Sequence, residues 1–258
     1  MRMGRIVPGS VPGVGVAVVR VRWVTGFLDS PSRVAEPFWE AVTGSRLSAR
    51  RGAAGEFATL VPPAGDAYLR VQVLAGSPPR THLDLHVDDV AEAVVEAVGR
   101  GAVVVFDEGD LVVVRSPAGV VFCLVSWRGE ARRPGGRGGG VDQLCVDVPS
   151  GLFEPEIEFW RGLTGWERRP SDRPEFEHLE RGPGMPLKLL VQRVGSAVAG
   201  MHVDLACTDV DAEVARHVGW GASVVRRVPG EWTTLRDPVG REYCVTGRAP
   251  LPESVGGA

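Results

Sequence analysis

The chain has 258 residues, of which 44% are hydrophobic and 24% are charged. This composition is typical of a folded protein with room for two domains of about 110–130 residues, and it excludes a disordered chain, a collagen and a small disulfide scaffold. The formal net charge is −3. We therefore expect no nucleic-acid partner, because such a partner requires a basic surface.

Four cysteines lie far apart in the sequence and form no C-x-x-C pair. Glycine and proline interrupt the first 21 residues, so this segment is neither the apolar core of a secretion signal nor a membrane span. We therefore expect a cytoplasmic protein with reduced thiols and no membrane partner. Lys188 is the only lysine, which we attribute to a compositional bias without functional meaning.

The predicted elements begin with a strand over 18–28, followed by a helix-start signal and an amphipathic helix over 34–42. The helix is expected to end at Thr43-Gly44, because glycine readily adopts the left-handed conformation that closes helices. Three short β-rich runs follow, at 47–51, 56–61 and 68–74.

The same order of elements then returns. A strand over 82–87 leads through a cap at Asp88 or Asp89 into a helix over 90–99. Three more β-rich runs follow, near 103–106, 111–115 and 121–125. The order β-α-β-β-β therefore occurs twice in the first half of the chain.

The second half of the chain repeats the first about 120 residues later. Trp39 returns as Trp160, His82 returns as His202, and the turn that begins at Ser116 returns at Asp237. The chain is thus a tandem duplication. We place one domain at 17–128 and the other at 141–249, joined by a glycine- and arginine-rich linker at 129–140.

Alternation along the strands separates a buried face from a face that could contact a ligand. In copy 1 the second face carries Arg70, Gln72, His82, Asp84, His86 and Cys123. In copy 2 it carries Gln143, Gln192, His202, Asp204 and Cys244, and Trp232 is a candidate pocket wall. A histidine and an aspartate two residues apart on a strand lie roughly 6–7 Å apart, so we expect them to contact a ligand or neighbouring strands more easily than each other.

The doubled plan and two motifs resemble the vicinal oxygen chelate superfamily, and within it the bacterial glyoxalase-like, bleomycin-resistance-like branch in tandem form. The motifs are H-L-D-L-x-V-x-D from His82 and S/D-P-x-G-x-x-F/Y-C, which ends at Cys123 and again at Cys244. The resemblance covers 18–127 and 141–248. It implies an α+β fold in which two β-α-β-β-β modules per copy form one cupped mixed sheet with a small-molecule cleft.

In metal-dependent members of this superfamily, the ligands come from the first, fourth, fifth and eighth strands of a copy. The resemblance assigns the fifth-strand histidine to His82 and His202, and the eighth-strand glutamate position to Cys123 and Cys244. The remaining positions hold Trp23 or Thr25 and Gln72 in copy 1, and Gln143 and Gln192 in copy 2. A hard divalent ion would lack its anionic ligand here, so we expect no firmly held metal cofactor.

Other readings of these residues stay open. His82 with Cys123, and His202 with Cys244, could still hold a divalent metal such as zinc, or form a nucleophilic cysteine–histidine dyad. Trp39 and Trp160 are expected in the core. His178 and His217 have no counterpart in the other copy, and we place them on the surface.

The sequence therefore predicts a protein that binds or transforms a small organic metabolite or antibiotic without a firmly held metal. The alternative is a metal-dependent lyase of glyoxalase type or an extradiol-type dioxygenase. A third possibility is that one copy is structural and only the other binds a ligand. We expect a monomer with intrachain domain pairing, or a homodimer.

Overall fold

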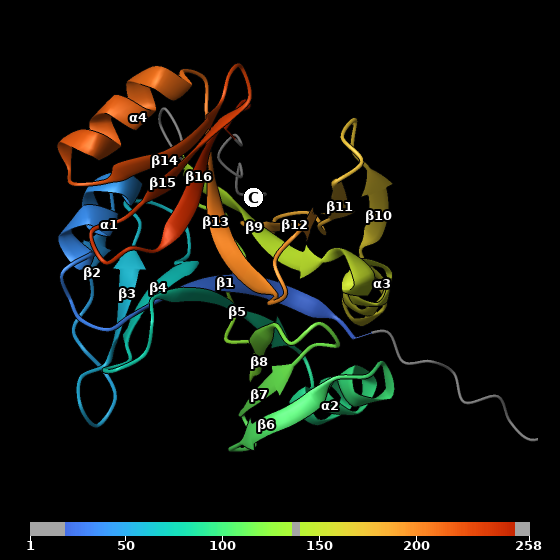
Figure 1. Cartoon of the computed structure of the whole chain (residues 1–258). Helices are drawn as coiled ribbons and strands as arrows, with labels where there is room; N and C mark the ends of the chain where they lie inside the picture. The colour runs from blue at the N-terminus through green and yellow to red at the C-terminus, as the bar shows by residue number, and fades with distance from the viewer. Residues whose placement is uncertain (1–18, 136–139, 251–258) are drawn as a thin grey trace, which may run out of the picture.

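A computed structural model describes residues 19–135 and 140–250 (Figure 1). Parts of the predicted boundaries, at 17–18 and 136–139, lie outside the described residues. The two sheets span 21–126 and 140–247. The exact domain boundaries and the linker at 129–140 stay predictions.

Copy 1 forms one eight-stranded sheet, sheet A, in the order β2-β3-β4-β1-β5-β8-β7-β6. The central pair β1 and β5 is antiparallel, and each of these strands has a parallel neighbour, β4 and β8 respectively. Its strands are β1 (Val21–Ser30), β2 (Arg46–Leu47), β3 (Phe57–Val61), β4 (Leu69–Val73), β5 (Arg80–Val87), β6 (Val103–Asp107), β7 (Leu111–Arg115) and β8 (Val121–Ser126).

Copy 2 forms sheet B with the corresponding order, β10-β11-β12-β9-β13-β16-β15-β14. Its strands are β9 (Gly140–Pro149), β10 (Glu167–Pro170), β11 (Phe176–Glu180), β12 (Lys188–Val194), β13 (Gly200–Cys207), β14 (Ser223–Val228), β15 (Trp232–Arg236) and β16 (Glu242–Gly247). The predicted α+β fold with two modules per mixed sheet is confirmed.

Each module contributes one α-helix: α1 (Glu36–Thr43), α2 (Val90–Gly99), α3 (Phe153–Thr164), which follows the short 3-10 turn η1 (Ser150–Leu152), and α4 (Val210–Gly219). Helix α1 begins two residues later than predicted, with Pro37 in its first turn, where the missing N–H costs no helical bond. It ends at Gly44 with a φ of 63°, as predicted. Asp89 is the N-cap of α2, and its side chain accepts from the Glu92 amide.

The helices pair across the two copies rather than within one. Phe38 of α1 packs against His217 of α4, and α2 lies beside α3 (Figure 1). Phe122 of β8 packs against Phe159 and Trp160 of α3. One hydrophobic core therefore runs through both copies. Trp39 and Trp160 lie in it, as predicted.

Polar contacts also tie the copies together. The Trp39 indole donates to Asp237 of copy 2 at 2.9 Å, and the Ala118 amide of copy 1 donates to Glu156 of α3 at 2.8 Å. Arg241, 3% exposed, forms an ion pair with Asp237 and donates to the Ser30 hydroxyl of copy 1. The intrachain pairing of the two copies is thus both apolar and hydrogen-bonded.

The surface position predicted for His217 is wrong. Its side chain is fully buried between Tyr243 and Glu213, at 3.0 Å from the Tyr243 hydroxyl and 3.0 Å from the Glu213 carboxylate. Copy 2 needs these partners because a buried imidazole must be hydrogen-bonded.

Among the described helices, each is too short or too polar to cross a membrane.

Candidate functional site

A cavity of about 810 Å³ lies on the concave face of sheet B, and we call it the sheet B cavity. All six of the copy 2 candidates from the sequence line it: Gln143, Gln192, His202, Asp204, Trp232 and Cys244. The alternation of strands β9, β12, β13 and β16 places them there, since the opposite faces of these strands supply core residues such as Leu144, Val191, Val203 and Tyr243.

His202 lies at the centre of this polar set. Its Nδ1 is 3.0 Å from Asp147 Oδ2, and its Nε2 is 3.1 Å from Asp204 Oδ1. The Cys244 sulfur is 3.7 Å from the same Nε2. The expectation that His202 and Asp204 would not contact each other is therefore wrong, because the imidazole reaches across the spacing of the strand.

The charge of His202 follows from these neighbours. Burial by itself would lower its pKa, but Cys145 and the carboxylates of Asp147 and Asp204 outweigh this and raise the pKa well above its usual value. Burial by itself would raise the pKa of Asp204, but His202 and a hydrogen bond from Gln143 outweigh this and lower the pKa of the carboxyl. His202 and Asp204 thus form a charged pair facing the cavity.

The corresponding face of sheet A is packed with side chains. His82 donates from Nδ1 to Asp29 at 2.9 Å and stacks on the Phe27 ring, with centroids 4.5 Å apart. His86 is hydrogen-bonded to Thr25 at 2.9 Å. The other copy 1 candidates occupy the same face: Arg70 over the Phe27 ring, Asp84 in register with Cys123, and Gln72 in register with Asp29.

Strand register explains why the two faces differ. Copy 1 pairs Phe27 with His82, whereas copy 2 pairs the smaller Cys145 with His202. Four residues further along, copy 1 pairs Trp23 with His86, and copy 2 has Gly140 opposite Ala206. The Phe27 ring is therefore replaced by a thiol that lines the sheet B cavity, whereas Gly140 lies outside that cavity. The same register identifies Thr25, rather than Trp23, as the counterpart of Gln143.

Three groups of side chains bring potential metal-ligating atoms within 4.8 Å of one another: His82-Asp84-Cys123, His202-Asp204-Cys244 and Cys145-Asp147-His202. Nitrogen, oxygen and sulfur donors suit zinc better than a hard divalent ion. His202 must lose its proton before it can ligate, and its two carboxylate neighbours oppose that loss. The donors therefore do not fit the hard ion that the resemblance implies, and zinc ligation stays an open alternative.

Some residues of the sheet B cavity escaped the sequence interpretation. Cys145 and Asp147 follow Gln143 at alternate positions of β9, so the parity rule already applied to β13 would have found them. Lys188 lies on the same face of β12 as Gln192, four residues before it. A single lysine in a composition rich in arginine gives no local signal of this position. His178, predicted at the surface, lines the cavity and is only partly exposed.

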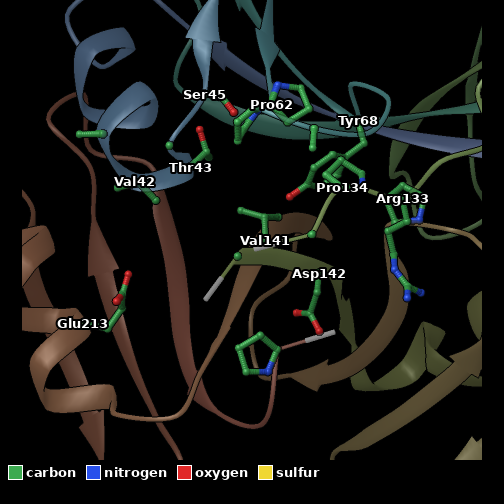
Figure 2. A pocket seen from close by; sticks show the side chains of 18 of the residues that line it. Val42, Thr43, Ser45, Pro62, Tyr68, Arg133, Pro134, Val141, Asp142 and Glu213 are labelled. Carbon is green, nitrogen blue, oxygen red and sulfur yellow. The ribbon is translucent and has the colours of Figure 1, made fainter. Parts of the chain in front are cut away.

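A smaller cavity of about 440 Å³ lies where α1, the loop before β4 and the start of β9 meet (Figure 2). Tyr68, Arg133, Asp142 and Glu213 contribute its polar groups, and prolines such as Pro62 and Pro134 form much of its wall. Asp142 also forms an ion pair with Arg248, which lines the sheet B cavity. The smaller cavity therefore backs onto the larger one through a shared ion pair.

A sequence model of the glyoxalase-like domain matches this chain twice, at residues 27–125 and 143–246. The chain belongs to the glyoxalase-like family. It is a tandem member of the vicinal oxygen chelate superfamily, as its motifs predict. No curated protein matches the sequence of this tandem glyoxalase-like protein.

Solved structures share the fold at low sequence identity. A halotolerant catechol dioxygenase, BphC, is 15% identical with a TM-score of 0.58, over 92% of this chain and 90% of that one. A variant of homoprotocatechuate 2,3-dioxygenase from B. fuscum is 12% identical with a TM-score of 0.63, over 95% and 75%. A fusion of a xylose isomerase-like TIM barrel with 4-hydroxyphenylpyruvate dioxygenase is 15% identical with a TM-score of 0.59. The match covers 96% of the tandem glyoxalase-like protein but only 52% of the fusion chain.

Proposed function

We propose that this tandem glyoxalase-like protein binds or transforms a small organic molecule in the sheet B cavity, and that copy 1 is its structural partner. The observation that carries the proposal is the replacement of Phe27, which stacks on His82, by Cys145, which lies opposite His202 and lines the cavity. A volume of about 810 Å³ is of the size that holds a drug-sized ligand. We expect no tightly held metal in this function.

A volume swap tests this proposal. Cys145→Phe introduces into copy 2 the ring that fills copy 1, and Phe27→Leu is the matched change in copy 1. A thermal-shift screen of catechols, aldehydes, aromatic acids and antibiotics supplies the ligands. We expect Cys145→Phe to abolish the ligand-induced shift and Phe27→Leu to retain it. A ligand that still stabilises Cys145→Phe but not Phe27→Leu would place the binding site in copy 1.

The alternative, a metal-dependent lyase or dioxygenase, is favoured by the His202-Asp204-Cys244 donors and by the folds of the dioxygenases. Elemental analysis of protein purified without chelator separates the two functions. We expect a substoichiometric metal content, and we expect His202→Asn to leave it unchanged. Stoichiometric metal that is lost in His202→Asn would establish the alternative instead.

A further inference from the structure

The charge of the sheet B cavity is opposite to that of the whole chain. Six arginine and lysine residues line it, against four aspartate and glutamate residues, although the chain carries a formal charge of −3. The cations are Arg80, Arg173, Lys188, Arg226, Arg241 and Arg248, and the anions are Asp147, Asp204, Glu231 and Glu242. A concave site lined by one sign of charge concentrates ligands of the other sign.

The carboxylates of the cavity are already paired with other residues. Asp147 and Asp204 flank His202, while Glu231 and Glu242 form ion pairs with Arg173 and Arg236. Within 19–135 and 140–250, Lys188 and Arg226 form no ion pair. An anionic ligand would therefore find two cations that are not held in an ion pair.

Lys188 is the more buried of these two cations, and its surroundings repel its charge. Burial lowers its pKa, and the Arg248 and Arg181 guanidinium groups lower it further, while Asp142 and Asp204 only partly oppose this. The same positive charges act on His178, because burial lowers the pKa of this histidine and the Lys188 and Arg248 cations lower it further. A bound anion would relieve this repulsion, and a buried charge gains more from such a partner than an exposed one.

Aromatic side chains lie in the same cavity. The Phe176 and Trp232 rings, from β11 and β15 on opposite wings of sheet B, meet edge-on with centroids 5.7 Å apart. The Arg173 and Arg226 guanidinium groups lie 5.3 and 5.8 Å from the centre of the Trp232 ring. Flat aromatic and guanidinium surfaces of this kind favour a planar ligand.

We infer that the ligand of the sheet B cavity is an aromatic carboxylate, with its acid group at Lys188 and its ring against Trp232 and Phe176. This inference rests on the proposed function of the cavity and adds the chemical class of its ligand. Lys188 is the specificity-determining residue, because it is the partly buried cation of the cavity that forms no ion pair with a carboxylate among the described residues.

The single lysine makes the test unusually direct. Protein grown with 13C-labelled lysine carries one labelled side chain, at Lys188. The probes are 2-naphthoate and its uncharged isostere 2-naphthamide, with binding followed by isothermal titration calorimetry and by the Lys188 13Cε signal. We expect the acid to bind at least about tenfold more tightly than the amide, as a charged hydrogen bond provides. The acid, but not the amide, should raise the pKa of Lys188.

Variants then separate charge from shape. Lys188→Gln should remove the preference for the acid without changing the affinity for the amide, while Lys188→Arg retains the preference. Arg128→Gln, which breaks an exposed pair with Asp110 of copy 1 outside the cavity, is the control and should retain it as well. Equal binding of both probes to the unaltered protein, lost in Cys145→Phe, would overturn this inference and leave the proposed function standing. If neither probe binds, this inference is overturned, and the thermal-shift screen decides the proposed function separately. If Cys145→Phe still binds the probes, both are overturned.

Discussion

At the scale of single residues, equivalent histidines have different surroundings in the two copies. His82 stacks on Phe27 and bonds to Asp29, which also holds Arg80. His202 has no ring above it and contacts two carboxylates and a thiol. The same residue at the same strand position is therefore a packed core group in copy 1 and an accessible charged group in copy 2.

The pH dependence of stability should reflect His86. Burial, together with the nearby Arg70 cation, lowers the pKa of His86 to about 4, and Glu130 only partly opposes this. The unfolded chain binds this proton near pH 6.5, so stability falls as the pH drops from about 6.5 towards about 4. Replacing His86 with leucine should flatten this part of the curve of unfolding free energy against pH, measured by urea denaturation. A curve of unchanged slope in His86→Leu would contradict the assignment.

At the scale of elements, the two copies approach each other closely at β1. A Cβ atom on Gly26 would lie 3.1 Å from Leu69 and 3.5 and 3.6 Å from Leu187 and Leu144 of copy 2. Glycine at this position lets the sheets pack. The neighbouring polar contact is made by Arg241, whose donors reach the carbonyl groups of Asp29 and Arg80.

Removing the Arg241 guanidinium should therefore destabilise the junction. Arg241→Met leaves the buried Asp237 carboxylate without its ion pair, and we expect a loss of about 3–5 kcal/mol in the free energy of unfolding. Arg236→Gln breaks an exposed pair with Glu242 and should cost about 0–1 kcal/mol. Urea denaturation measures both, and equal losses would show that Arg241 does not hold the copies together.

At the scale of the whole molecule, the two copies share one core. Helix α1 packs on copy 2 and α3 packs on copy 1, so each copy alone would expose the aromatic side chains that its partner covers. Phe122 and Trp160, with centroids 4.8 Å apart, are an example of such a pair. The duplication therefore gives one folding unit with two different halves.

We expect the two copies to unfold together. Differential scanning calorimetry should show one transition, with a calorimetric enthalpy equal to the van't Hoff enthalpy. Phe122→Ala in copy 1 should lower the midpoint of this single transition, because it removes about 3–5 kcal/mol of core packing. Two transitions, of which Phe122→Ala moves only one, would show that the copies fold independently.

The sequence by itself determined the architecture. The offset repeat, the Thr43-Gly44 helix end and the alternation of the strand from His82 predicted four modules and the face on which the polar residues lie. These features are local, since strand parity and helix caps depend on residues a few positions apart. The motif ending at Cys123 and Cys244 was sufficient for the family.

Only the tertiary structure decided which copy has a cavity. The repeat makes His82 and His202 equivalent, and no local pattern shows that Phe27 covers one while Cys145 leaves the other open. The partners of His217 and the position of Lys188 in a field of cations likewise come from strands far apart in the chain. Register across β1–β5 and β9–β13 places Phe27 on His82 and Cys145 opposite His202, and the volume left in a cup depends on which side chains face each other.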